Sequence, residues 1–113
     1  MAQGDIKQVT NNSGKSNNIY YCKMPDGTLI QWGKGTISGG SGSVTFTLPV
    51  SFVDTAYAVV ASPDIVTSSS GVYGTGATFP TQITAVNQVR VHRSNSSATY
   101  DNYVYFIAIG RWK

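Results

Sequence analysis

The last strand-like segment of the chain, residues 103–112, is apolar at almost every position. Because side chains in a strand alternate between two faces, the segment predicts two apolar surfaces. One face would consist of Tyr103, Tyr105, Ile107 and Ile109, and the other of Val104, Phe106, Ala108 and Trp112. A strand that is apolar on both sides needs cover on both sides. With 113 residues and polar loops, the chain is too small to supply both covers, so we expect another copy of the same chain to supply one.

The same two-residue periodicity predicts strands along the rest of the chain. Strands are expected at 28–37, 44–48, 56–61, 82–93 and 103–112, the third as a buried strand, with a short or irregular strand inside a long loop at 62–80. Pro25 and Gly27 suit a tight turn before the first strand, because proline presets φ and glycine accepts a positive φ. About six strands separated by turn signals indicate an all-β, antiparallel β-sandwich. We interpret polar residues 1–18 as an arm or linker and residues 19–113 as one domain.

The composition narrows the classes of partner. Charged residues make up only 12% of the chain, and the net charge is +3. A surface of Gly, Ser, Thr and Asn suits neutral polar ligands, and the small positive balance mildly favours acidic sugars. We expect no nucleic-acid partner because basic residues form no run, and no membrane insertion because no apolar run is long enough. No secretion signal is expected, and we interpret the lone Cys22 as a buried thiol, with an interchain disulfide as the alternative.

Catalytic chemistry has little support in the sequence. The five acidic residues show no spacing that suggests a pair, and nucleophile-elbow, phosphate-loop and zinc-site patterns are missing. We therefore expect no enzyme activity, no catalytic residue, no cofactor and no metal site. The one histidine, His92, is interpreted as a half-exposed strand residue. Its alternatives are a ligand contact or, in a trimer, three imidazoles that bind a metal or a small anion.

The aromatic residues fall into two groups. Those within apolar segments favour packing in the core or between subunits, and the candidates are Trp32, Tyr103, Tyr105, Phe106, Ile107, Ile109 and Trp112. Aromatic residues in polar loops suit a sugar, because the ring covers the C–H side while neighbouring polar groups bond the hydroxyls. The glycan-binding candidates are Tyr73, Arg90, His92, Arg93, Asn95, Tyr100, Asp101 and Asn102. An ordinary solvated loop remains the alternative.

A series of motifs over about residues 20–112 resembles a known family. The series consists of Met24-Pro-Asp-Gly27, Leu29-Ile-Gln-Trp-Gly33, Val44-Thr-Phe-Thr-Leu-Pro49 with Phe52, Ala58-Val-Val-Ala61 and Phe106-Ile-Ala-Ile-Gly110. It is similar to the C-terminal receptor-binding domains of phage and prophage tail fibres, the gp53-like family. A more distant likeness is to the H-type lectins, in which Tyr100 matches a sugar-contacting tyrosine. Ser94 and Asn95 stand where those lectins carry a tryptophan–histidine pair, so their N-acetylgalactosamine specificity is not carried over.

The resemblance implies a homotrimer, H-type-lectin-like in fold, at the distal tip of a tail fibre. Such a tip binds a host cell-surface receptor, a glycan such as lipopolysaccharide or capsule or else a surface protein, without catalysis. Its partners would be that receptor, its own copies and the rest of the fibre, and it would be assembled in the bacterial cytoplasm before becoming part of the virion. The alternatives are a purely structural trimerisation or capping module, a free-standing lectin and a glycan-trimming enzyme.

Overall fold

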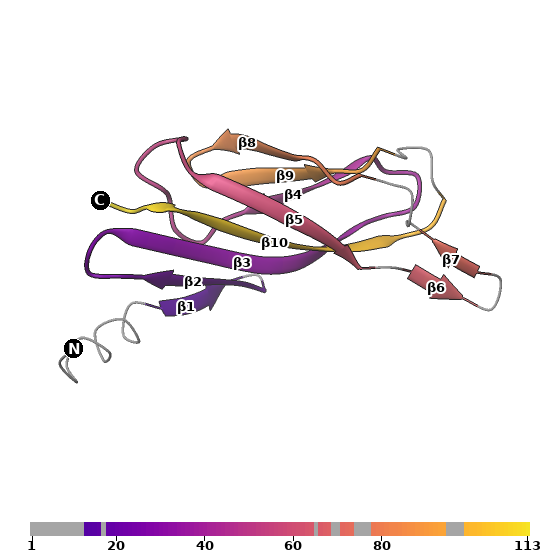
Figure 1. The fold of residues 1–113 in the computed structure, drawn as a ribbon, viewed down its shortest axis with the longest axis horizontal. Coiled ribbons are helices and arrows are strands. Elements are labelled where there is room, and N and C mark those ends of the chain that lie inside the picture. Colours follow the sequence, from indigo (N-terminus) through magenta and orange to yellow (C-terminus); the bar gives the residue numbers. More distant parts are fainter. Residues whose placement is uncertain (1–12, 17, 65, 69–70, 74–77, 95–98) are drawn as a thin grey trace.

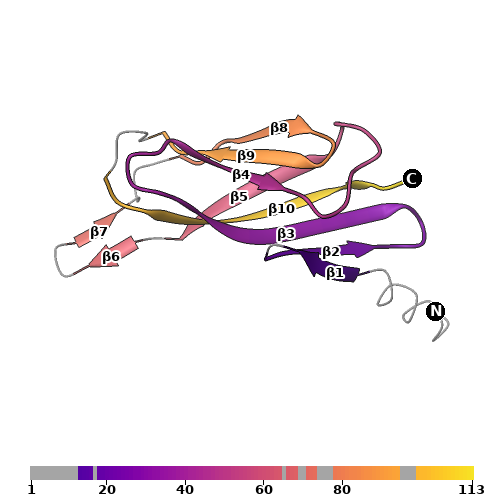
Figure 2. The same ribbon diagram turned by 180° about the vertical axis from the view of Figure 1, so that it is seen from behind.

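The computed structural model describes residues 13–16, 18–64, 66–68, 71–73, 78–94 and 99–113. Its strands, in chain order, are β1 (Ser13–Ser16), β2 (Ile19–Lys23), β3 (Thr28–Ile37), β4 (Ser43–Thr47), β5 (Ala58–Asp64), β6 (Val66–Ser68), β7 (Gly71–Tyr73), β8 (Thr81–Ala85), β9 (Gln88–His92) and β10 (Asn102–Arg111). A five-stranded sheet has the order β1-β2-β3-β10-β5, and a three-stranded sheet has the order β4-β9-β8. These two sheets form two layers, and the β6–β7 hairpin extends from one end (Figures 1 and 2).

The antiparallel pairing confirms the all-β sandwich predicted from the sequence. The described part of the chain has more strands than the six expected. β1 and β2 were not predicted, the short strand expected within 62–80 is the β6–β7 hairpin, and the single strand expected at 82–93 is two paired strands, β8 and β9. The expectation of a buried strand at 56–61 is wrong. β5 begins at Ala58 and lies at the edge of its sheet, where it pairs with β10 alone, and Val60 is 61% exposed.

The central strand β10 divides its side chains between core and surface as predicted. Val104, Phe106 and Ala108 point inward and are buried between the sheets. The Phe106 ring lies 4.4 Å, centroid to centroid, from the ring of Phe46 on the opposite sheet. A Cβ on Gly35 would meet the Phe46 ring at 2.5 Å, so glycine at this position lets that ring pack against β3. The core therefore depends on β3 and β10 lying side by side.

A buried glutamine connects β3 to the segment that follows β4. Gln31 is fully buried, and its Nε2 donates to the Val50 carbonyl at 2.8 Å while its Oε1 accepts from the Val50 amide at 3.1 Å. Further along, the Tyr57 ring stacks on Phe52, and its hydroxyl donates to the Ala85 carbonyl at 2.7 Å. Burial raises the pKa of Tyr57, which keeps the hydroxyl protonated as a donor. These contacts fix the loop between the two sheets.

The expected turn at 24–27 is confirmed. Gly27 has a φ of 101°, and its amide donates to the Met24 carbonyl at 3.0 Å. The Asp26 carboxylate accepts from the Thr28 amide at 2.9 Å, and this hydrogen bond lowers the pKa of Asp26. The Trp112 indole donates to the Met24 carbonyl at 3.0 Å. The C-terminal end of the chain is thereby fastened to the turn that precedes β3.

The first described residues belong to the five-stranded sheet. β1 pairs with β2 from Ser13↔Cys22 to Ser16↔Ile19, so strand pairing begins before residue 19. Residues 1–12 lie outside the described residues, and the role of residues 1–18 as an arm stays a prediction. Cys22 is half-buried on β2 rather than fully buried as expected.

Candidate functional site

The outer face of the five-stranded sheet carries large side chains that the sandwich leaves uncovered. On β10, Tyr103, Tyr105, Ile107 and Ile109 share this face, as the sequence predicts, and each is 39–45% exposed. Trp32, on β3, is also exposed on this face, and the remaining two members of the predicted core-or-interface set lie elsewhere. Phe106 is buried in the core, and Trp112 packs against the core at the end of the chain.

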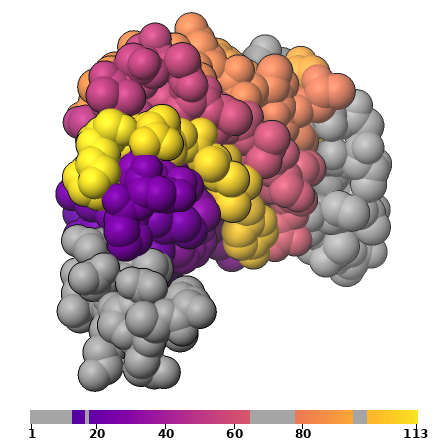
Figure 3. Space-filling view, turned by 60° about the vertical axis from the view of Figure 1, so that its left-hand side comes forward, coloured from indigo at the N-terminus to yellow at the C-terminus, as the bar shows by residue number. Residues whose placement is uncertain are grey.

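Cross-strand pairing organises this face into rows. One row runs across four strands and consists of Tyr20, Trp32, Ile107 and Val60. The Tyr20 and Trp32 rings are stacked, with centroids 5.7 Å apart and an interplanar angle of 13°. A second apolar row consists of Ile30, Ile109 and Ala58. Figure 3 shows the N-terminal strands directly beside the C-terminal segment at the surface. We call these two rows the apolar end of the outer face.

Towards the opposite end of β10 the rows become polar. Tyr105 lies between Lys34 and Ser62, and Tyr103 lies between Thr36 and Asp64. The Lys34 ammonium is 4.8 Å from the Tyr103 ring centroid and 5.4 Å from that of Tyr105, so it is held between two aromatic rings. Along β10, from Ile109 to Tyr103, the side chains of the outer face therefore change from aliphatic to aromatic and cationic.

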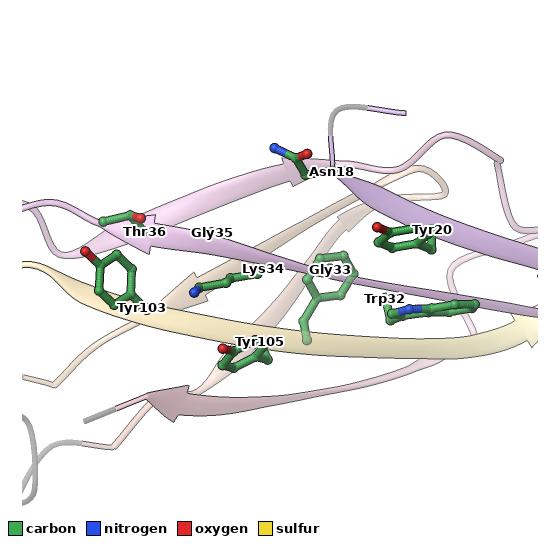
Figure 4. A pocket seen from close by; sticks show the side chains of 10 residues that line it. Asn18, Tyr20, Trp32, Gly33, Lys34, Gly35, Thr36, Tyr103 and Tyr105 are labelled. Atoms are coloured by element: carbon green, nitrogen blue, oxygen red, sulfur yellow. The ribbon is translucent and has the colours of Figure 1, made fainter. Parts of the chain in front are cut away.

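A groove of about 510 Å³ lies at this aromatic end (Figure 4). Its side chains come from the loop before β2 and from β2, β3 and β10, and we define the aromatic groove by Asn18, Tyr20, Trp32, Lys34, Tyr103 and Tyr105. Figure 4 shows the Tyr20–Trp32 stack at one end and Lys34 between Tyr103 and Tyr105 at the other. The volume lies in the range of small-ligand sites.

Three residues of this groove, Asn18, Tyr20 and Lys34, are not among those predicted from the sequence. Tyr20 precedes the first strand that the sequence predicted, and Lys34 is the only charged residue in β3. A usable signal was the position of Lys34 two residues after Trp32, which places both on one face of a strand. The pairing of Tyr20 with Trp32 depends on the register of β2, which the sequence alone does not give.

Two of the predicted glycan contacts are structural. Arg93 is 3% exposed, and Asn102 is fully buried. The Arg93 guanidinium donates to the carbonyls of Ser38, Ser41 and Tyr100 and to Asn102 Oδ1, at 2.8–2.9 Å. In this arrangement Arg93 joins the β3–β4 loop to the β9–β10 loop, and its donors point at the protein instead of at a surface ligand.

Tyr100 and Asp101 lie at the surface beside this buried arginine. The Tyr100 ring is half-buried, with its centroid 5.6 Å from the Arg93 guanidinium. The Asp101 side chain is exposed, and its carboxylate accepts from the Gly39 amide at 2.7 Å. These two residues and the 38–41 turn form the loop end of the molecule, and both side chains can be reached from solvent there.

Arg90 and His92 occupy a different surface. They lie on β9, in the three-stranded sheet, and are half-exposed, as expected for His92. Arg90 Nε donates to Thr45 Oγ1 at 3.1 Å, and His92 Nε2 donates to Gln82 Oε1 at 2.8 Å. Tyr73 ends β7, and nothing is described of its side chain, while Asn95 lies outside the described residues. The predicted glycan contacts are thus spread over several surfaces.

Two classes of feature are missing from the ranges that the structure describes. Those ranges contain no helix that is long and apolar enough to cross a membrane. Within them, no three His, Cys, Asp or Glu side chains gather as metal ligands do.

Comparison with known proteins identifies fibre domains. A family profile described as "putative tail fiber protein gp53-like, C-terminal" matches residues 23–111. Among solved structures, the chain resembles the R2 pyocin fibre of P. aeruginosa with a TM-score of 0.65 at 15% identity, over 88% of this chain and 25% of that one. It resembles the R1 pyocin fibre of P. aeruginosa with a TM-score of 0.62 at 20% identity, over 87% and 27%.

The chain thus spans about a quarter of those fibre chains. An N-truncated R1-type pyocin tail fibre matches with a TM-score of 0.60 at 16% identity, over 97% of both chains. At these identities the likeness concerns the fold. None of the curated protein sequences matches the chain.

Proposed function

We propose that this chain, which belongs to the gp53-like tail fibre C-terminal family, is the receptor-binding tip of a tail fibre that attaches a phage particle to its host. The family match over residues 23–111 carries this proposal, because it covers nearly the whole described sandwich. The likeness to pyocin fibres supports the same architecture. As a fibre component the protein is part of the particle, and we place its assembly in the host cytoplasm.

The proposed tip is a homotrimer joined to the rest of its fibre. The exposed aliphatic side chains of this face support assembly, because contiguous apolar side chains on a sheet face mark an interface. We assign the contact between copies to the aliphatic part of the apolar end, Ile30, Val60, Ile107 and Ile109, and not to the Tyr20–Trp32 stack. Three copies on one fibre present three receptor sites, and tethering raises the overall avidity by orders of magnitude when the geometry permits.

The receptor is proposed to be a cell-surface glycan, bound without being cleaved. Labelled protein should bind cells of a host strain, and purified protein should leave the host's capsule and lipopolysaccharide at full length. A wild-type protein that decorates no strain of a broad panel would instead indicate a purely structural capping module. Shortening of the glycan would indicate an enzyme.

A first prediction concerns the loop end. We expect Tyr100→Ala to weaken adsorption to host cells by up to about tenfold, because the substitution removes an accessible ring while keeping the backbone carbonyl that Arg93 binds. Adsorption is measured by flow cytometry of labelled protein. Thr84→Ala, at an exposed position of β8, is the control and should adsorb as wild type does.

The mass of the Tyr100→Ala variant in sedimentation should equal that of the wild type. Unchanged adsorption by this variant would remove Tyr100 from the proposed contacts. A changed mass would show that the loop end contributes to assembly.

A further inference from the structure

The aromatic groove contains hydrogen-bonding groups that the fold does not use. Within the described part of the chain, the hydroxyls of Tyr20, Tyr103 and Tyr105 and the side-chain amide of Asn18 make no hydrogen bond to protein. The Tyr57 hydroxyl, by contrast, has carbonyl acceptors in the core. Unused donors and acceptors that surround an aromatic groove are the arrangement expected of a site for a polyhydroxylated ligand.

The groove also carries positive charge. The Lys34 ammonium lies between the rings of Tyr103 and Tyr105, and Lys15 lies 5.2 Å from the Tyr20 ring centroid just beyond the stack. Asp64 is paired with Tyr103 on the neighbouring strand, and it forms no ion pair with Lys34 among the described residues. A cation that rests on aromatic rings keeps its N–H donors for an anionic ligand.

From these contacts, the geometry points to a saccharide that bears a carboxylate as the ligand of the aromatic groove. This assignment rests on the proposed receptor-binding function and specifies the chemical class of the receptor. Lys34 binds the carboxylate, the tyrosine hydroxyls and Asn18 bond sugar hydroxyls, and the aromatic walls cover the C–H faces of the sugar. Trp32, Tyr103 and Tyr105 are thereby assigned to ligand binding, and they lie beside the aliphatic residues at which copies meet.

The charge of the groove favours a carboxylate over a phosphate monoester. A phosphate monoester carries a charge of about −1.5 to −2 at neutral pH, and it is commonly bound by arginine forks. The groove offers one lysine, which acts as a single point charge, and no arginine lines it. One ammonium among neutral hydroxyls matches a singly charged carboxylate.

Isothermal titration of the full chain with defined saccharides tests this assignment. The probes are oligogalacturonate, oligomannuronate and oligosialate, each compared with its methyl ester, which removes the charge and keeps the sugar. We expect at least one acid to bind, and its ester to bind about tenfold more weakly. Added salt should weaken the binding of the acid and leave that of the ester unchanged.

Lys34→Gln should weaken binding of that acid by about tenfold, because the charge is lost and the side-chain length is nearly kept. Lys23→Gln is the matched control. Lys23 also lies over an aromatic ring, 5.1 Å from the centroid of Trp112, but it is not part of the groove. We expect this control to bind as wild type does.

Three results would overturn the assignment: no acid binds in a millimolar titration, acid and ester bind equally, or Lys34→Gln binds the acid as wild type does. A Lys34→Gln variant that no longer assembles would overturn it as well, because the groove would then be an interface between copies. If the wild-type protein still bound host cells after any of these results, the proposed receptor-binding function would be unaffected. Failure of wild-type protein to bind any cell would reject that function separately.

Discussion

Replacing Ile107 with glutamate is expected to convert the assembled protein into single chains. Ile107 lies on the central strand of the outer face, between Trp32 on one neighbouring strand and Val60 on the other. In a single chain the side chain is already 39% exposed, so a carboxylate there would be solvated and the fold would persist. Between copies, the same carboxylates would be withdrawn from water without a partner, which costs several kcal/mol per charge.

Sedimentation at micromolar concentration measures this effect. The Ile107→Glu variant should sediment as a single 12.1 kDa chain, whereas the wild type should sediment as a trimer of that chain. Thr47→Glu is the control, because Thr47 is exposed on β4, in the three-stranded sheet and not on the outer face of the five-stranded sheet. Near-identical circular dichroism of the two variants would show that both are folded. A wild type that sediments as a single chain would contradict the proposed trimer.

The division of β10 into two faces could be predicted from the sequence. Alternation has a fixed period of two, so once the segment is a strand, Val104 and Tyr105 must face opposite ways. The prediction needed no knowledge of the neighbouring strands. The fold class followed for the same reason, because apolar alternation and turn residues are local signals.

The composition of the site could not be predicted in this way. Arg93 and Asn102 have the polarity of surface residues. The burial of Arg93 depends on carbonyls of Ser38 and Ser41, more than 50 positions away in the chain, and Asn102 in turn accepts from Arg93. A buried polar group is stable only when its partners are in place, and those partners are backbone atoms that every residue type carries. The sequence alone therefore does not show that the loop predicted to contact a glycan packs over a buried arginine.

Replacing Arg93 with alanine is expected to lower the free energy of unfolding by about 3 kcal/mol and the melting temperature by roughly 10–15 °C. The substitution takes the charged donor away from the buried Asn102 Oδ1 and from the partly buried carbonyls of Ser38, Ser41 and Tyr100. Unsatisfied buried acceptors cost more than the hydrogen bonds themselves contribute. Urea unfolding, followed by tryptophan fluorescence, measures the change.

Two further variants separate this structural role from a contact with the receptor. Arg93→Lys keeps the charge but replaces a planar fork with a single ammonium, which cannot reach all the acceptors in the two loops, so most of the stability loss should remain. Arg90→Ala removes an arginine whose Nε bonds Thr45 at the surface, and its stability should change by less than about 0.5 kcal/mol. If Arg93→Ala unfolded like the wild type and yet failed to adsorb to cells, the guanidinium would be a receptor contact. Because its donors are already directed to protein oxygens, we expect the loss of stability instead, with any loss of adsorption following from the disturbed loop end.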